Sequence, residues 1–140
     1  MLLRNTTDVP PLLVRYIYNF VKPPGMSDPE LIQFKNKQKG IYHGQWGWYY
    51  SKDKRVVLII PPSFNGKVIR DRLKYSKKYI EMRNRVEFIV AIMAHELRHH
   101  WQHENWDGWR LDRKGDGKWC REVDAEIYEL QMLRKWRRDH

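Results

Sequence analysis

The chain has 140 residues and a formal net charge of +10, a size that suits one domain with a single hydrophobic core. It has no run of about 18 apolar residues and no apolar leader after Met1, so we expect neither a membrane span nor a signal peptide. A single cysteine, Cys120, excludes an internal disulfide. We therefore expect one monomeric domain, residues 1–140, in the reducing environment of the cytoplasm.

The first part of the chain predicts two helices. Residues 9–20 begin with two prolines and continue with apolar residues at helical spacing. A capping pattern at Ser27 predicts a second, short helix that buries Leu31, Ile32 and Phe34.

Two strands are expected next. Ile41 to Tyr50 is rich in alternating aromatic residues, and Arg55 to Ile60 is a β-branched run that two prolines stop. The polar residues 51–54 between them suit a turn. The two segments therefore predict an antiparallel hairpin.

A further helix is predicted from Lys67 to Ile80, where apolar residues recur at helical spacing. This is the densest basic stretch of the chain. Its lysines and arginines are either a solvated helix face or a surface that contacts phosphates, with Tyr75 and Tyr79 able to stack on bases. The net charge fits a nucleic-acid partner, but it also fits a role in solubility alone.

The apolar run from Val86 to Trp101 contains the sequence H-E-x-x-H, with His95, Glu96 and His99. Residues four apart on a helix lie on the same face, so both imidazoles can reach one metal ion. Glu96 lies beside them, where a carboxylate can take a proton from a water that the metal activates. Because buried His and Glu side chains need partners, a metal would satisfy all three.

A third metal ligand is expected from the last predicted helix, Trp119 to Arg138. Glu122 and Glu126 lie four apart on its apolar face. His100 and His103 follow the motif on the same helix but are poorly directed for a shared ion. Either glutamate can be the ligand, and the alternative is that both form salt bridges with arginines.

H-E-x-x-H followed by a helical E-x-x-A-[D/E] resembles the gluzincin zinc metallopeptidases, and the short chain resembles the minigluzincins. The resemblance covers residues 82–136. It implies an α+β, zincin-like domain, in which a short antiparallel sheet packs on the H-E-x-x-H helix and a C-terminal helix carries a glutamate. It also implies zinc bound by His95, His99 and Glu122, with Glu96 as the general base and Glu126 orienting a zinc-bound histidine.

By the same resemblance the chain is a zinc-dependent endopeptidase of proteins or peptides. Such enzymes pair the substrate with an edge strand, and Val56, Leu58 and Ile60 are the candidates, unless their strand is an interior one. The residue that stabilises the oxyanion stays open between His103, His43 and Tyr128.

Two alternatives remain. One is a nucleic-acid-associated protease like the SprT/Spartan group, whose third ligand is a later histidine. The other is a non-enzymatic basic DNA-binding module, with a structural metal that Cys120 helps to close. Another divalent metal could also replace zinc.

Overall fold

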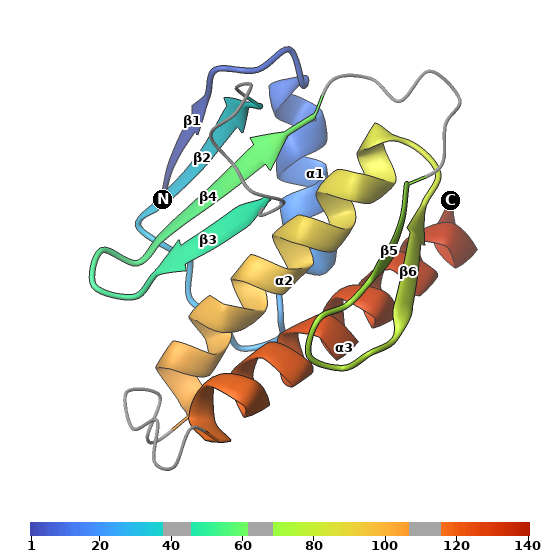
Figure 1. The fold of residues 1–140 in the computed structure, drawn as a ribbon. Coiled ribbons are helices and arrows are strands. Elements are labelled where there is room, and N and C mark those ends of the chain that lie inside the picture. Colours follow the sequence, from blue (N-terminus) through green and yellow to red (C-terminus); the bar gives the residue numbers. More distant parts are fainter. Residues whose placement is uncertain (38–45, 62–68, 107–115) are drawn as a thin grey trace.

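The computed structural model describes residues 1–37, 46–61, 69–106 and 116–140 (Figure 1). Its fold class is α+β, which confirms the predicted class. In chain order the elements are β1 (Leu2–Asn5), α1 (Pro11–Val21), β2 (Leu31–Asn36), β3 (Gly47–Tyr50), β4 (Arg55–Ile60), β5 (Ile69–Arg72), β6 (Tyr79–Met82), α2 (Arg85–Asn105) and α3 (Asp116–Asp139). Within these ranges, no helix is both long enough and apolar enough to cross a bilayer.

The larger sheet has the strand order β1-β2-β4-β3. The antiparallel pairing of β3 with β4 confirms the predicted hairpin, although residues 41–45 of the predicted strand lie outside the described ones. The rest of the sheet is parallel, so the prediction of a wholly antiparallel sheet is wrong. The reason is that α1 carries the chain back between β1 and β2, as a crossover connection does.

The prediction of a short helix after Ser27 is wrong, because Leu31–Asn36 forms strand β2. Ile32 and Phe34 are fully buried, whereas Leu31 and Gln33 between them are only partly so. That alternation has the period of a strand.

The helix predicted from Lys67 to Ile80 is also wrong. From residue 69 on, this segment forms the hairpin of β5 and β6, and its residues 67 and 68 lie outside the described ones. The turn is closed by the bond from the Leu73 N–H to the Lys78 carbonyl, at 2.8 Å, and Lys77 adopts a positive φ of 62°. Ile80 and Met82 are buried, while Tyr79 between them is exposed, so the period is two rather than that of a helix.

Helix α2 lies between the sheet and α3, with α1 beside it (Figure 1). Asn84 caps its start by accepting a hydrogen bond from the Glu87 N–H, and the Glu87 carboxylate accepts one from the Arg83 N–H. The predicted helices over 86–101 and 119–138 are therefore confirmed, each with extensions at its ends.

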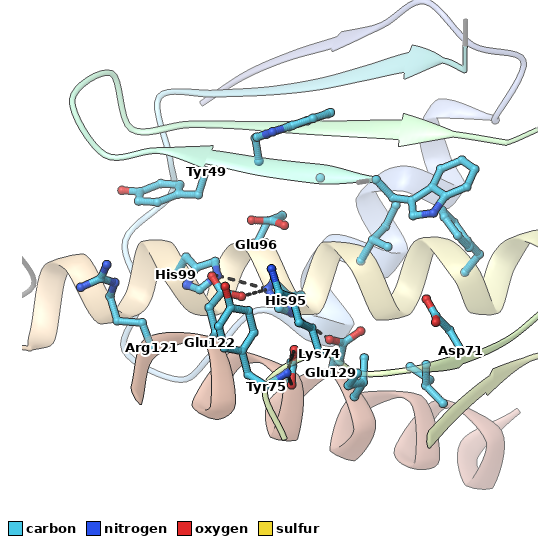
Figure 2. A pocket seen from close by; sticks show the side chains of 18 of the residues that line it. Tyr49, Asp71, Lys74, Tyr75, His95, Glu96, His99, Arg121, Glu122 and Glu129 are labelled. Atoms are coloured by element: carbon cyan, nitrogen blue, oxygen red, sulfur yellow. Dashed lines mark hydrogen bonds and ion pairs between the residues drawn. The ribbon is translucent and has the colours of Figure 1, made fainter. Parts of the chain in front are cut away.

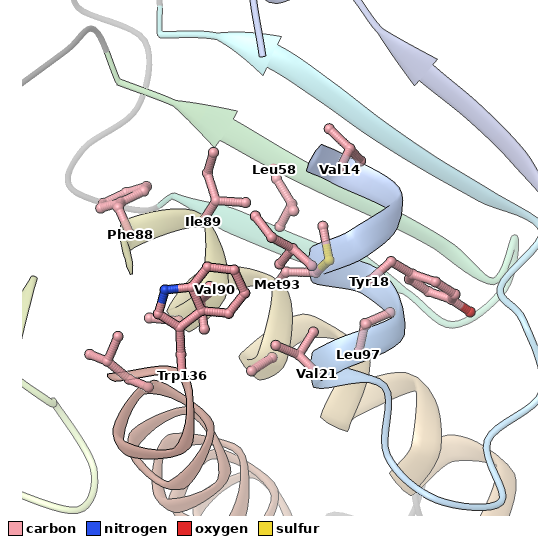
Figure 3. Packing of buried hydrophobic residues seen from close by; sticks show 14 of the residues in the cluster. Val14, Tyr18, Val21, Leu58, Phe88, Ile89, Val90, Met93, Leu97 and Trp136 are labelled. Atoms are coloured by element: carbon pink, nitrogen blue, oxygen red, sulfur yellow. The ribbon is translucent and has the colours of Figure 1, made fainter. Parts of the chain in front are cut away.

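The hydrophobic core lies between β4, α1 and α2 (Figure 3). Val56, Leu58 and Ile60 of β4 are at most 1% exposed and face the helices. β4 pairs with β2 on one side and with β3 on the other. The prediction that these three residues form a substrate-binding edge strand is therefore wrong. Among the described strands, β3 lies at that end of the sheet.

We predict that Leu97→Ala lowers the free energy of unfolding by about 3 kcal/mol, because it leaves a cavity in the core. Leu97 is 0% exposed in the middle of α2. Leu12→Ala is the matched control, since Leu12 is 82% exposed on α1 and should change the free energy by less than about 0.5 kcal/mol. Urea unfolding of both variants measures the difference, and equal losses would contradict the core described above.

Candidate metal centre

Two helices bring the candidate ligands together (Figure 2). His95, Glu96 and His99 lie on the face of α2 that borders a cleft, and Glu122 reaches them from α3. His95 is partly exposed to the cleft, whereas Glu96 and His99 are 7% and 6% exposed. The first three form a group whose donor atoms all lie within 4.8 Å of one another and could hold a metal ion.

The distances between the imidazoles and Glu122 are those expected of ligands that share one ion. The two Nε2 atoms of His95 and His99 are 3.2 Å apart. The Glu122 carboxylate lies 3.2 Å from His95 Nε2 and 2.9 Å from His99 Nε2. Donor atoms on a tetrahedral zinc ion at ordinary bond lengths lie about 3.3 Å apart.

The far nitrogen of each imidazole is held by a separate partner. His95 Nδ1 lies 2.8 Å from Glu129 Oε1, and His99 Nδ1 lies 2.9 Å from Gln102 Oε1. A carboxylate oxygen and an amide oxygen only accept, so both Nδ1 atoms donate their proton outward. Partners of this kind orient metal-binding histidines and leave the Nε2 lone pair facing the ion.

The orientation of the Gln102 amide is itself fixed. Its Nε2 donates to the Arg121 carbonyl at 2.9 Å and to Asp124 Oδ2 at 2.7 Å. Its oxygen must therefore face His99. Asp124 is in turn bound by the Arg98 guanidinium through two hydrogen bonds, which join α2 to α3 beside the site.

The buried groups of the cluster shift one another's pKa values. Burial by itself lowers the pKa of His95, but the neighbouring Glu129 and Glu122 carboxylates outweigh it and raise that pKa well above its ordinary value. Burial also raises the pKa of Glu129. For Glu122, burial favours the neutral form, but hydrogen bonds from His95 and His99 outweigh it and hold its pKa far below the usual range. The cluster thus favours a positive charge, which a second proton on His95 or a metal ion would supply.

Glu96 lies beside the ligands and is directed toward β3 (Figure 2). A Cβ added at Gly47 would come within 2.8 Å of Glu96 Oε2 and 2.9 Å of its Cγ. Gly47 is therefore required where the strand passes over this side chain. Burial raises the pKa of Glu96 above its ordinary value. Among the described residues, no hydrogen bond or ion pair occupies its carboxylate.

Glu126 does not orient a histidine, so that prediction is wrong. Its carboxylate instead accepts hydrogen bonds from the backbone N–H groups of Tyr75 and Ser76 in the β5–β6 turn. Glu129 contacts His95 in its place. Seven residues advance a helix by almost two full turns, so Glu129 follows the direction of Glu122 more closely than Glu126 does. The spacing of seven residues from Glu122 is therefore the sequence signal for Glu129.

The structure gives different outcomes for the three residues predicted as candidates to stabilise the oxyanion. The Tyr128 hydroxyl is buried and donates to the Val21 carbonyl, which excludes it from the cleft. His103 lies 3.3 Å from the Tyr49 hydroxyl. His43 lies outside the described residues. Cys120 is an exposed free thiol and is not part of the candidate metal group.

The cleft at the site has a volume of about 660 Å³. Strand β3 and helix α2 line one side of it, and the β5–β6 hairpin and α3 line the other. Tyr49 and Tyr75 are the tyrosines that line it within the described residues. His95, Glu96 and His99 therefore lie at this cleft.

We predict that the protein binds one equivalent of zinc, and that Glu122→Ala abolishes this binding because it removes one of three ligands. Glu126→Ala is the matched control from the same helix. It should retain the metal because, among the described residues, the hydrogen bonds of the Glu126 carboxylate go to the hairpin and not to the histidines. Metal content after dialysis measures both. Loss of zinc in Glu126→Ala alone would identify Glu126, one helical turn further along α3, as the ligand and would contradict the geometry described above.

Comparison of the chain with models of protein families, with curated proteins and with solved structures finds no match. What the protein does must therefore be argued from the chemistry of the site.

Proposed function

We propose that this protein is a zinc-dependent endopeptidase that hydrolyses protein or peptide substrates in a gluzincin-like manner. The observation that carries the proposal is the convergence of donor atoms on His95, His99 and Glu122, with the Glu96 carboxylate beside them. In this proposal Glu122 is the third ligand and Glu96 stays free of the metal. Three protein ligands with an open fourth position are typical of catalytic zinc, whereas structural zinc sites are closed by four.

The donor set supports zinc. Two imidazoles and one carboxylate are borderline ligands that suit zinc better than magnesium or calcium, which prefer oxygen alone. His95, His99 and Glu122 would hold the ion. When bound there, zinc supplies Lewis-acid chemistry, which acidifies water and polarises a carbonyl group.

Glu96 is the general base of the proposed reaction. It takes a proton from the attacking water and passes it to the leaving amine. Its raised pKa suits both steps, because a carboxylate that is more basic than usual accepts a proton more readily. Its contact with the backbone at Gly47 fixes its direction toward the cleft.

The substrate would lie against β3 instead of β4. Gly47, Trp48 and Tyr49 of β3 line the cleft, whereas β4 is covered on both sides. On the opposite wall of the cleft, Tyr75 takes the place of His103, His43 and Tyr128 as the candidate that donates a hydrogen bond to the substrate carbonyl. Glu126 holds the Tyr75 backbone in position, and the Tyr75 side chain lies at the cleft (Figure 2).

We predict that Glu96→Gln lowers the rate of peptide hydrolysis by at least about 100-fold, because the amide cannot accept the proton. Cleavage of an unfolded protein such as casein by the zinc-loaded protein measures the rate. Zinc content is the control and should stay at one equivalent, since Glu96 is not a ligand in this proposal. A zinc-loaded wild type that cleaves no unfolded protein, or a fully active Glu96→Gln, would refute the proposal.

We predict that Gly47→Ala lowers the same rate by about 10- to 100-fold, because the added methyl group pushes Glu96 aside. The variant should keep its zinc, which separates displacement of the base from loss of the metal. An unchanged rate would show that the position of Glu96 against β3 does not matter for activity.

A further inference from the structure

The β5–β6 hairpin, residues 69–82, has two faces of different character. Ile80 and Met82 are buried against the core, and Asp71 lines the cleft. Strand alternation turns Arg72 and Tyr79, which are a cross-strand pair, to the other side. The hairpin is thus a cleft wall on one face and a solvent-exposed surface on the other.

The exposed surface carries a large share of the chain's charge. Residues 70–78 hold five cations and one carboxylate, a net charge of +4 against +10 for all 140 residues. Arg70 is paired with Glu81 at 3.1 Å. Lys74 lines the cleft, whereas Arg72, Lys77 and Lys78 do not. These last three are exposed and form no ion pair with any described residue. We call Arg72, Lys77, Lys78 and Tyr79 the basic surface.

Tyr79 gives the basic surface an aromatic platform. Tyr79 is 75% exposed, more than any other aromatic residue in the described part of the chain. The Arg72 guanidinium lies 5.9 Å from the centre of its ring. A cation beside an exposed aromatic ring matches how proteins bind unpaired nucleic acid, where the cation contacts phosphate and the ring stacks on a base.

The backbone under the basic surface is held in place. The buried carboxylate of Glu126 accepts the N–H groups of Tyr75 and Ser76 in the turn. At the other end of the hairpin, the Arg137 guanidinium donates to the Glu81 carbonyl. A fixed array of cations loses less conformational entropy on binding than a loose one.

We propose that the basic surface of the β5–β6 hairpin binds single-stranded nucleic acid. Exposed cations alone would also suit a duplex or an acidic protein, but the exposed ring of Tyr79 favours unpaired bases. This inference is independent of the proposed peptidase activity, because none of the four residues lines the cleft or belongs to the candidate metal group.

The test uses a fluorescently labelled single-stranded oligonucleotide of mixed sequence, bound by the zinc-loaded full chain and followed by anisotropy over a salt series. Lys77→Ala with Lys78→Ala should reduce the slope of log K against log salt by about 1.4, since each lost phosphate contact removes about 0.7. Tyr79→Ala should weaken single-strand binding by about tenfold and leave the slope unchanged, because a stacked base carries no charge.

The matched control is Arg134→Ala with Lys135→Ala, which removes the same charge from exposed positions on α3. This control should change the affinity by no more than about twofold. Salt screens the attraction between the oligonucleotide and cations that lie away from its binding site, so only nearby cations contribute strongly. An equal loss in this control would overturn the assignment to the hairpin. Equal affinity of the wild type for a duplex or for polyglutamate, or no effect of Tyr79→Ala, would overturn single-strand recognition. Glu96→Gln should bind as the wild type does, which keeps this test separate from that of the peptidase.

Discussion

The contact on which the site depends is the meeting of two imidazoles and a carboxylate between α2 and α3. The Glu122 carboxylate lies 3.2 Å from His95 Nε2 and 2.9 Å from His99 Nε2, and the two Nε2 atoms are 3.2 Å apart. Such a group is repulsive unless a cation lies within it, because the outer nitrogens already donate to Glu129 and Gln102. Polar groups of this kind are costly to bury without a partner. A positive charge in the site would supply that partner.

Three glutamates of α3 each bind a different part of the cleft. Glu122 faces the imidazoles, Glu129 orients His95, and Glu126 holds the turn of the β5–β6 hairpin. One helix thus sets both the candidate metal group and the opposite wall of the cleft. The same bond that brings Tyr75 to the cleft also fixes the basic surface on the outer face of the hairpin, so the two proposed functions share a support without sharing residues.

The sequence predicted the helices of the site and the hairpin of β3 and β4, but not β2 or the hairpin of β5 and β6. His95, Glu96 and His99 lie in a long apolar run, whose helical period is unambiguous, and Glu122 is found by the same period. Leu31–Asn36 and the β5–β6 hairpin were predicted as helices, because short apolar runs fit both periods and only tertiary pairing decides between them. The position of β4 inside the sheet depends on its pairing with β2, far away in sequence, which no local pattern contains.

The proton and the metal compete for the same place in this cluster. The carboxylates of Glu129 and Glu122 raise the pKa of His95, so they favour its doubly protonated form. To coordinate a metal through Nε2, His95 must give up that proton, whereas its Nδ1 proton stays on the side of Glu129. The same carboxylates would also attract a metal ion. They would attract a divalent ion more strongly than a proton, because its charge is higher. Metal affinity should therefore rise with pH through the range in which His95 loses its second proton.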